Sequence, residues 1–257
     1  MKDRVKPLKG VMNFRDFGGY SGDDGAIVKP GLLFRTGSLH RADDSDIDFL
    51  NTLNIDFQVD LRRQAERAHE PNKWAPHEVH TYNDTTGIAG AHIEFMKNGQ
   101  LTADSSRQFM VDYYARAPWV DSHVDLYQRW FRRLAETDGA GMINCAAGKD
   151  RTGIGCALTL TLVGVDDDTV MQDYLLTNTA VNLEERLPKA RAKWEERLGI
   201  KLDNDEVVHP FLGVKEEYLH KAYATIREKH GSIEGYAEEV LGVDESRRQQ
   251  LKDKLLG

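Results

Sequence analysis

Residues 141–153 read Gly-Met-Ile-Asn-Cys-Ala-Ala-Gly-Lys-Asp-Arg-Thr-Gly, and this stretch decides the fold. Its first four residues form a short apolar run that predicts a buried strand, and a helical pattern begins at Arg151. A chain that leaves a strand, makes a tight turn and enters a helix points several backbone N–H groups inward. Together with the positive end of the helix dipole, these groups form a binding site for an anion.

Cys145 and Arg151 give this predicted anion site its chemistry. The positive surroundings of a helix N-terminus favour the thiolate form of a cysteine over the thiol. The planar guanidinium of an arginine six positions further along can bind two oxygens of one phosphate. We therefore predict that the sulfur attacks a bound phosphoryl group.

Two other interpretations compete with this one. A free cysteine is most often a small buried apolar residue, but the glycine turn and the spacing to Arg151 favour a nucleophile. A nucleotide-binding P-loop requires Ser or Thr after its lysine and a glycine five positions before its second glycine. Those positions hold Asp150 and Ile143, so that interpretation is rejected.

Composition narrows the class of protein. The chain has 257 residues, 40% of them apolar, and no Pro/Gly/Ser-rich linker, which predicts one domain over residues 1–257. A net charge of −8 argues against nucleic acid or an anionic membrane as the default partner.

Two cysteines form no disulfide framework, and Cys156 is expected in the core. No signal peptide or transmembrane stretch is seen, so we expect the reducing cytoplasm.

The remaining pattern predicts an α/β layered fold, because strands fill the first half and helices surround the last strand. Strands and turns are expected at 13–19, 32–36, 55–61, 78–82 and 139–145. A helix capped by Asp43 or Asp44 should run to about Leu53. Further helices are expected at 103–117, 120–136, 151–163, 166–178, 183–198, 215–229, 232–241 and 244–255.

A helical insertion is expected over residues 83–136. Residues 83–100 are polar and contain several glycines, which is typical of a loop, and two of the predicted helices follow them. A segment of this kind can close over a site, exclude water and shape access for the substrate. We therefore interpret residues 83–136 as a lid.

The chain resembles the cysteine-dependent phosphatase superfamily, and more narrowly the bacterial tyrosine phosphatases of broad specificity whose loop reads Cys-x-x-Gly-Lys-Asp-Arg-Thr-Gly. The resemblance extends from about residue 10 to residue 242. Its motifs, in family order, are Asn13-Phe-Arg-Asp-Phe-Gly-Gly19, Leu33-Phe-Arg-Thr-Gly-Ser38, Val59-Asp-Leu-Arg62, Asp173-Tyr-Leu-Leu-Thr-Asn178 and Gly231-Ser-Ile-Glu-Gly-Tyr236. It implies a mixed central sheet flanked by helices, a phosphocysteine intermediate, and neither metal nor cofactor.

The resemblance also implies roles for the loop residues. Cys145 would be the nucleophile, and Arg151 would bind the phosphate and stabilise the charge on its oxygens. Thr152 would donate its hydroxyl to the sulfur, with simple packing at the helix start as the alternative. The backbone amides of the loop would complete the substrate-binding site, which comprises Ala146, Ala147, Gly148 and Lys149.

Two basic positions remain open. In similar phosphatases a lysine at the place of Lys149 accompanies phosphoinositide substrates, whereas a solvated loop lysine is the alternative. Arg62 and Arg63 follow a predicted strand, where sites tend to lie in open α/β sheets. We expect one of them, taken as Arg62, to support the substrate-binding loop, with a surface position as the alternative.

The general acid has three candidates. A neutral carboxyl near the leaving oxygen should speed its departure by about 10²–10⁴. In the subgroup with Lys-Asp-Arg in the loop the aspartate beside the arginine is proposed to serve, which points to Asp150. Asp84, placed among the substrate-binding residues, comes second, and Asp112 comes last because a surface position on a helix suits it better.

Asn144 departs from the family pattern, which usually has histidine before the nucleophile. Asparagine can form hydrogen bonds but cannot become cationic, so the thiolate would be less stabilised. His77 and His80 have the spacing of a metal-binding pair, but a zinc site needs more ligands than the sequence offers nearby, and we predict no metal.

The leading hypothesis for function is a phosphatase that hydrolyses phosphotyrosine. Phosphoserine, phosphothreonine and phosphoinositides are further candidate substrates, and the partner is then a phosphorylated protein, peptide or phosphoinositide. The alternative is a catalytically weak module that binds phosphate and recruits phosphorylated partners, motivated by Asn144 and by the open choice of acid. A sulfur-transfer enzyme with a cysteine loop is disfavoured by the sequence Lys-Asp-Arg-Thr-Gly.

Overall fold

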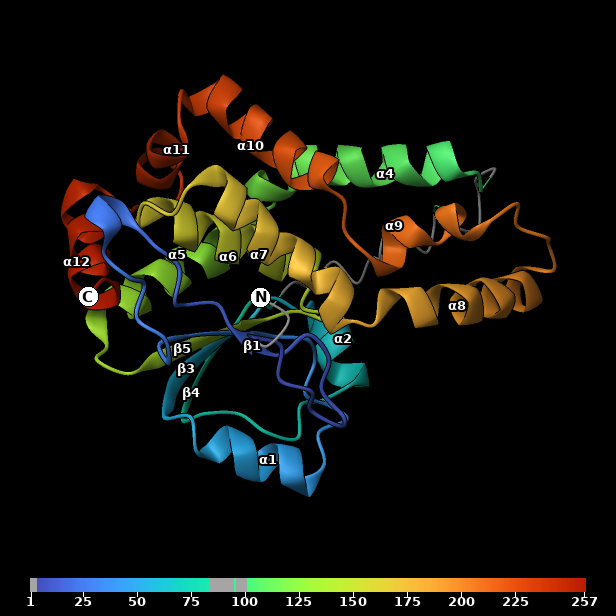
Figure 1. Ribbon diagram of the computed structural model, residues 1–257, viewed down its shortest axis with the longest axis horizontal. Helices are drawn as coiled ribbons and strands as arrows, with labels where there is room; N and C mark the ends of the chain where they lie inside the picture. Colours follow the sequence, from blue (N-terminus) through green and yellow to red (C-terminus); the bar gives the residue numbers. More distant parts are fainter. Residues whose placement is uncertain (1–3, 84–94, 96–100) are drawn as a thin grey trace.

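The computed structural model describes residues 4–83, 95 and 101–257, and a five-stranded mixed sheet lies at its centre (Figure 1). The strands run in the order β1-β2-β5-β3-β4. β1 is antiparallel to β2, and every other neighbouring pair is parallel. The strands are β1 (Arg15–Asp16), β2 (Leu33–Thr36), β3 (Ile55–Asp60), β4 (Glu78–Thr81) and β5 (Ala140–Asn144).

Both faces of the sheet are apolar, because strand residues alternate between two hydrophobic clusters. On β2 and β5, Leu33 and Ile143 belong to the larger cluster, whereas their neighbours Phe34 and Met142 belong to the smaller one. The larger cluster includes residues of α5, α6, α7 and α12, while the smaller one packs against α1. The central strands therefore lie inside a layered α/β fold.

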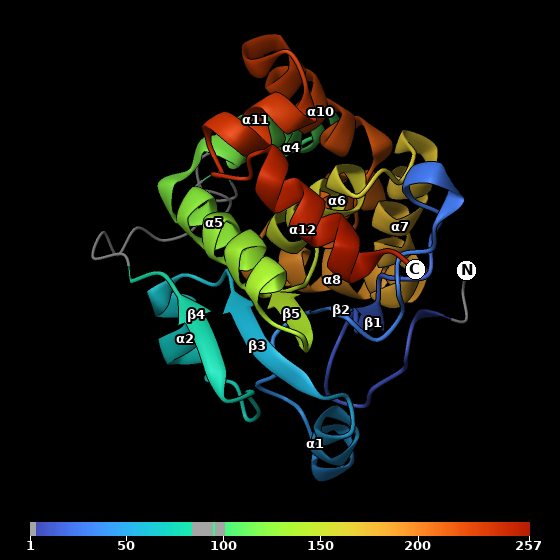
Figure 2. The same cartoon turned by 90° about the vertical axis from the view of Figure 1, so that its left-hand side faces the viewer.

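Helices flank the sheet on both sides. In Figure 1, α1 covers one face of the sheet, and α5, α6 and α7 lie on the other; Figure 2 shows α12 packed beside α5. α4 and α10 also lie side by side. The helices are α1 (Asp44–Asn51), α2 (Gln64–His69), α4 (Ala103–Arg116), α5 (Asp121–Glu136), α6 (Asp150–Leu162), α7 (Asp167–Ala180), α8 (Leu183–Leu198), α9 (His209–Leu212), α10 (Glu216–His230), α11 (Ile233–Glu239) and α12 (Glu245–Leu255), with 3₁₀ turns at Asp23–Gly25, Ala117–Trp119 and Asp205–Val207.

The expected α/β fold with a mixed sheet is confirmed. Asp43 is the N-cap of α1, with its side chain accepting a hydrogen bond from the Asp46 amide at 2.9 Å. Cys156 is buried within α6, as expected, and burial raises its pKa to about 12, which keeps it a thiol. The first strand is shorter than expected, because only Arg15 and Asp16 pair with β2.

Two short helices were not expected from the sequence. α2 has six residues and buries none of them fully, so it lacks the apolar period that marks a longer helix. α9 has four residues, with Pro210 in its first turn. Most of the expected loop at 83–100 lies outside the described residues, so the lid over residues 83–136 stays a prediction. The single domain over residues 1–257 also stays a prediction.

Candidate active site

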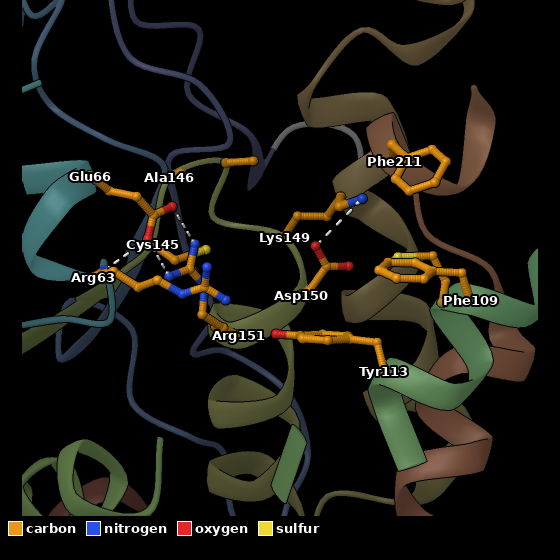
Figure 3. Close-up of a pocket in the computed structure, with 12 residues that line it drawn as sticks. Arg63, Glu66, Phe109, Tyr113, Cys145, Ala146, Lys149, Asp150, Arg151 and Phe211 are labelled. Atoms are coloured by element: carbon orange, nitrogen blue, oxygen red, sulfur yellow. Dashed lines mark hydrogen bonds and ion pairs between the residues drawn. The ribbon is translucent and has the colours of Figure 1, made fainter. Parts of the chain in front are cut away.

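Cys145 directly follows β5 and lines a cavity of about 240 Å³. β5 lies between two parallel strands, so its carboxyl end opens at the edge where sites form in such sheets. The loop 145–149 then leads into α6, whose first turn contains Asp150 and Arg151. The cavity is lined by Arg63, Glu66, Phe109, Met110, Tyr113, Cys145, Ala146, Ala147, Lys149, Asp150, Arg151 and Phe211 (Figure 3).

Donors from outside the loop hold its carbonyl groups. The Ala146 carbonyl accepts from the Ser38 amide at 3.0 Å. The side chain of Asn13 donates to the carbonyls of Ala147 and Gly148, at 3.3 and 2.6 Å. Because carbonyl and N–H point in opposite directions across a trans peptide, these bonds direct the amide N–H groups of the three following residues away from the donors. N–H groups directed in this way, next to the start of α6, are what an anion-binding loop requires.

Gly148 cannot be replaced without moving the loop. Its φ is +64°, a conformation that residues with a side chain rarely adopt, and a Cβ there would lie 2.5 Å from the Thr36 carbonyl carbon. The loop thus passes close over the end of β2. The turn that the sequence suggested depends on this glycine.

A buried ion cluster supports the loop from behind. Asp173 of α7 binds Arg15 at 3.2 Å and Arg35 at 3.1 Å, and all three side chains are buried. Arg35 also donates to the Gly148 carbonyl at 2.9 Å, and Arg15 donates to the Asn13 side chain. Three motifs far apart in sequence therefore meet behind the loop, which explains physically why they occur together.

Arg151 is oriented by Glu66, a residue of α2. Arg151 Nη1 and Nη2 donate to the two Glu66 carboxylate oxygens, both at 2.8 Å, and Nη1 also donates to the Leu61 carbonyl at 2.8 Å. In the described part of the chain, no acceptor takes the Nε–H of Arg151. Nε and Nη2 form one planar edge of the guanidinium, so this edge stays available for two phosphate oxygens.

We predict that Glu66→Gln destabilises the protein by about 2 kcal/mol at neutral pH and less in acid. Burial alone would raise the pKa of Glu66, but its hydrogen bonds to Arg151 and the charge of Arg151 lower it from 4.5 to about 2. A depressed carboxyl pKa stabilises the fold above the ordinary value, and this contribution is lost as pH falls from about 4.5 through about 2. The full difference in pKa corresponds to roughly 3 kcal/mol of folding free energy. We expect a smaller loss because a third of the Glu66 side chain is exposed to water, which screens the charge.

Urea unfolding of wild type and Glu66→Gln at pH 7 and pH 3.5 measures this contribution. The difference between the two proteins should shrink by about 1 kcal/mol at the lower pH. Glu228→Gln is the control, because Glu228 is exposed on α10. A difference that is equal at both pH values would show that the Glu66–Arg151 pair does not stabilise the fold.

The three aspartates proposed as the general acid have different surroundings. Asp150 lines the cavity, and its Oδ1 accepts a hydrogen bond from Tyr114 Oη at 2.8 Å. Asp112 is exposed on α4 and accepts from Gln108 at 2.8 Å, which agrees with the surface position expected for it. Asp84 lies outside the described residues. Of the two that the structure describes, only Asp150 lies at the cavity.

Lys149 is buried rather than solvated. Its ammonium group donates to the carbonyls of Pro210 and Gly213, at 3.1 and 3.0 Å, and lies 3.5 Å from Asp150 Oδ2. The interpretation of Lys149 as a solvated loop lysine is therefore wrong. Lys149 connects the loop to α9 and adds positive charge to the cavity wall (Figure 3).

Thr152 and Asn144 flank the nucleophile loop on its buried side. Thr152 Oγ1 is buried and has no hydrogen-bond partner among the described residues, so its hydroxyl is free to donate. Asn144 is fully buried, donates to Asp60 Oδ1 at 3.1 Å and accepts from Gln58 at 2.7 Å. Its side chain therefore joins β5 to β3 at the place where the family usually has histidine.

The structure places Arg62 outside the main cavity, and its support of the substrate-binding loop stays a prediction. The Arg62 guanidinium is buried against Asp60, at 2.7 Å, and donates to Ser38 Oγ at 2.9 Å. It does not line the main cavity; its neighbour Arg63 does. Adjacent residues point in different directions where β3 ends, and the sequence could not show which of the two faces the site.

Two further findings concern metals and membranes. Within the described ranges, no group of three or more His, Cys, Asp or Glu side chains is arranged to hold a metal ion. None of the helices in those ranges combines the length and the apolar character needed to cross a bilayer.

Comparison with known proteins identifies the family. The sequence model of the tyrosine phosphatase family matches residues 6–257. The chain belongs to the tyrosine phosphatase family. This phosphatase is 31% identical to the triple specificity protein phosphatase PtpB of Mycobacterium tuberculosis, over 98% of this chain and 99% of that protein. It is 29% identical to a putative tyrosine-protein phosphatase of Cupriavidus necator (91% and 83% covered) and 29% identical to a tyrosine-protein phosphatase of Nostoc commune (86% and 73%).

The predicted phosphatase activity is thereby confirmed, and the enzyme acts on phosphorylated substrates. Sequence reasoning missed several residues that the structure brings to the site. Glu66 belongs to the short helix α2, and Phe109, Tyr113 and Phe211 line the cavity from α4 and α9. Arg63, which the sequence offered beside Arg62, is the N-cap of α2 and also lines the cavity. Glu66 follows the Val59-Asp-Leu-Arg62 motif by four residues, which was the one signal available for it.

Proposed function

We propose that this phosphatase hydrolyses phosphotyrosine monoesters through a phosphocysteine intermediate. The observation that carries the proposal is that Cys145, Arg151 and Asp150 line one cavity at the start of α6. Phe109, Tyr113 and Phe211 supply aromatic walls to the same cavity, and Phe109 and Phe211 have ring centroids 5.9 Å apart. Such walls suit an aryl ester. The related PtpB is named a triple specificity phosphatase.

In the first step, the Cys145 thiolate attacks phosphorus. An S–P bond forms while the bond from phosphorus to the tyrosine oxygen breaks. The free edge of Arg151 and the inward amides of the loop bind the equatorial phosphate oxygens, where charge is held through the transition state. Glu66 supports this step through Arg151, because it fixes the plane of the guanidinium.

Asp150 supplies the proton that the leaving phenoxide needs. Its carboxyl lines the cavity two residues after Gly148, and the fixed loop holds it beside the substrate site. In the second step, water attacks the phosphocysteine, Asp150 takes a proton from it, and the sulfur leaves. The Thr152 hydroxyl, buried without a partner in the described ranges, would donate to the departing sulfur.

The site suits a phosphorylated protein or peptide as partner. Lys149, the residue that goes with phosphoinositides in similar phosphatases, has its ammonium bound to two backbone carbonyls. This arrangement supports phosphotyrosine as the first substrate, with phosphoserine and phosphoinositides as additional ones. A reducing compartment such as the cytoplasm fits a catalytic thiolate.

We predict that Asp150→Asn lowers kcat/KM for a phosphotyrosine peptide by about 10²-fold and leaves kcat/KM for an aryl phosphate with a strongly acidic leaving group almost unchanged. The quotient kcat/KM covers only the steps up to release of the leaving group, so it does not include the second step, in which Asp150 acts as the base. A good leaving group departs without a proton, so only the poor one needs the acid. Steady-state assays of wild type, Asp150→Asn, Asp84→Asn and Asp112→Asn on both substrates measure this difference. Asp112→Asn is the matched control from the exposed face of α4.

The same assay separates the alternatives. If Asp84→Asn, and not Asp150→Asn, shows the dependence on the leaving group, the acid is Asp84. Phosphoserine peptides and phosphoinositide vesicles, added to the panel, test the wider substrate range. A wild-type enzyme that binds phosphotyrosine peptide and fails to hydrolyse it would support the weak phosphate-binding module instead.

A further inference from the structure

Tyr114 connects the proposed acid to the interior of the protein. Tyr114 belongs to α4, is fully buried, and donates its hydroxyl to Asp150 Oδ1 at 2.8 Å. Tyr174, in α7, donates its own hydroxyl to Tyr114 Oη at 2.8 Å. The two bonds form a chain from Tyr174 through Tyr114 to Asp150, and each donor in such a chain strengthens the next.

The second oxygen of Asp150 also has a neighbour. Asp150 Oδ2 lies 3.5 Å from Lys149 Nζ, whose position is fixed by two backbone carbonyls. A carboxyl with a donor on one oxygen and a fixed cation near the other cannot rotate freely. Because Oδ1 already accepts a hydrogen bond, the acidic proton of Asp150 belongs on Oδ2.

The ring of Tyr114 is held independently of its hydroxyl. It stacks on Tyr218 with ring centroids 5.5 Å apart and meets Tyr174 edge to face at 6.3 Å. Burial raises the pKa of both Tyr114 and Tyr174 well above the ordinary tyrosine value, so both hydroxyls keep their protons. Phenylalanine at position 114 would therefore keep the packing and lose only the hydrogen bonds.

We propose that Tyr114, supported by Tyr174, is a positioning residue that holds the Asp150 carboxyl with its proton on Oδ2. The inference rests on the proposed role of Asp150 as the acid. When the leaving oxygen takes that proton, the bond from hydrogen to Oδ2 breaks and Asp150 becomes a carboxylate. The Tyr114 hydroxyl and the Lys149 ammonium group then stabilise the new negative charge.

Tyr114→Phe tests the positioning role. We expect kcat/KM for phenyl phosphate to fall about 10-fold, the value of one hydrogen bond to a charged group, while kcat/KM for 2,4-dinitrophenyl phosphate changes less than about twofold. Tyr174→Phe should show the same pattern at about threefold, since it acts through Tyr114. The ratio of the two kcat/KM values does not depend on how much of a preparation is folded, so a loss of folded protein cannot imitate this result.

Tyr223→Phe is the matched control. Tyr223 is a buried tyrosine of α10 that loses a single hydrogen bond, 2.8 Å to Thr161, when its hydroxyl is removed. It should leave the ratio unchanged. Tyr114→Phe added to Asp150→Asn should not change the ratio further, because the group that it positions is already gone.

Two outcomes would overturn the inference, and they differ in what else they overturn. If Asp150→Asn changes the ratio and Tyr114→Phe does not, the positioning role is wrong and the acid assignment stands. If Asp150→Asn leaves the ratio as in wild type, both the acid assignment and the role of Tyr114 are wrong.

Discussion

Cys145→Ser should lower kcat for a phosphotyrosine peptide by at least about 10⁵-fold, as the loss of a nucleophile does in other enzymes. A serine hydroxyl at this place stays protonated at neutral pH and is a far weaker nucleophile than a thiolate. Nothing else that lines the cavity replaces it, because Cys145 is the cavity's one thiol among the described residues. Single-turnover assays with radiolabelled phosphopeptide would measure the residual rate.

Binding should survive the same substitution. The Arg151 edge and the loop amides are unchanged in Cys145→Ser, so calorimetry with the phosphopeptide should give a Kd within about threefold of the wild-type KM. Cys156→Ser is the control, because Cys156 is buried in α6 and outside the cavity. Turnover by Cys145→Ser above one-thousandth of the wild-type rate would reject Cys145 as the nucleophile.

The loop and the main elements could be predicted because their signals are local. β5, Gly148 and α6 follow one another within a short stretch, and each has its own pattern: an apolar run, a turn residue and a helical period. The longer helices α5, α8 and α12 repeat apolar residues over several turns or begin with a capping side chain. Their predicted ends agree with the structure to within one residue.

The partners of the loop could not be predicted because they are distant in sequence. Glu66 lies 85 residues before Arg151, and Tyr114 lies 36 residues before Asp150. An ion pair or hydrogen bond of this kind depends on how α2 and α4 pack around the end of β5. A single sequence carries no pattern for that packing, since the helix α2 is short and has no buried face.

Side-chain direction was the second limit. Arg62 and Arg63 both follow β3, yet one is buried against Asp60 and the other lines the cavity. The strand period that would separate them stops where the strand stops. Lys149 shows the same limit. A lysine in a loop is expected to be exposed, and the sequence does not show that the carbonyls of α9 and of the turn after it surround this ammonium group.

Asp173→Asn should destabilise the protein by about 3–5 kcal/mol, as breaking a buried ion pair does. Burial alone would raise the pKa of Asp173, but the charges of Arg15 and Arg35 lower it, so the residue is a buried carboxylate at neutral pH. Asparagine leaves both guanidinium groups buried without their counter-charge. Urea unfolding at pH 7 would measure the loss.

Asp167→Asn provides the comparison within the same helix. Asp167 pairs with Arg227 at 2.7 Å on the surface, and exposed pairs are worth less than about 1 kcal/mol. Asp173→Asn should also weaken the binding of inorganic phosphate, because Arg35 joins Asp173 to the Gly148 carbonyl. If the two variants lose equal stability, the buried cluster does not support the loop. If Asp173→Asn is unstable and still binds phosphate normally, the cluster stabilises the fold without shaping the site.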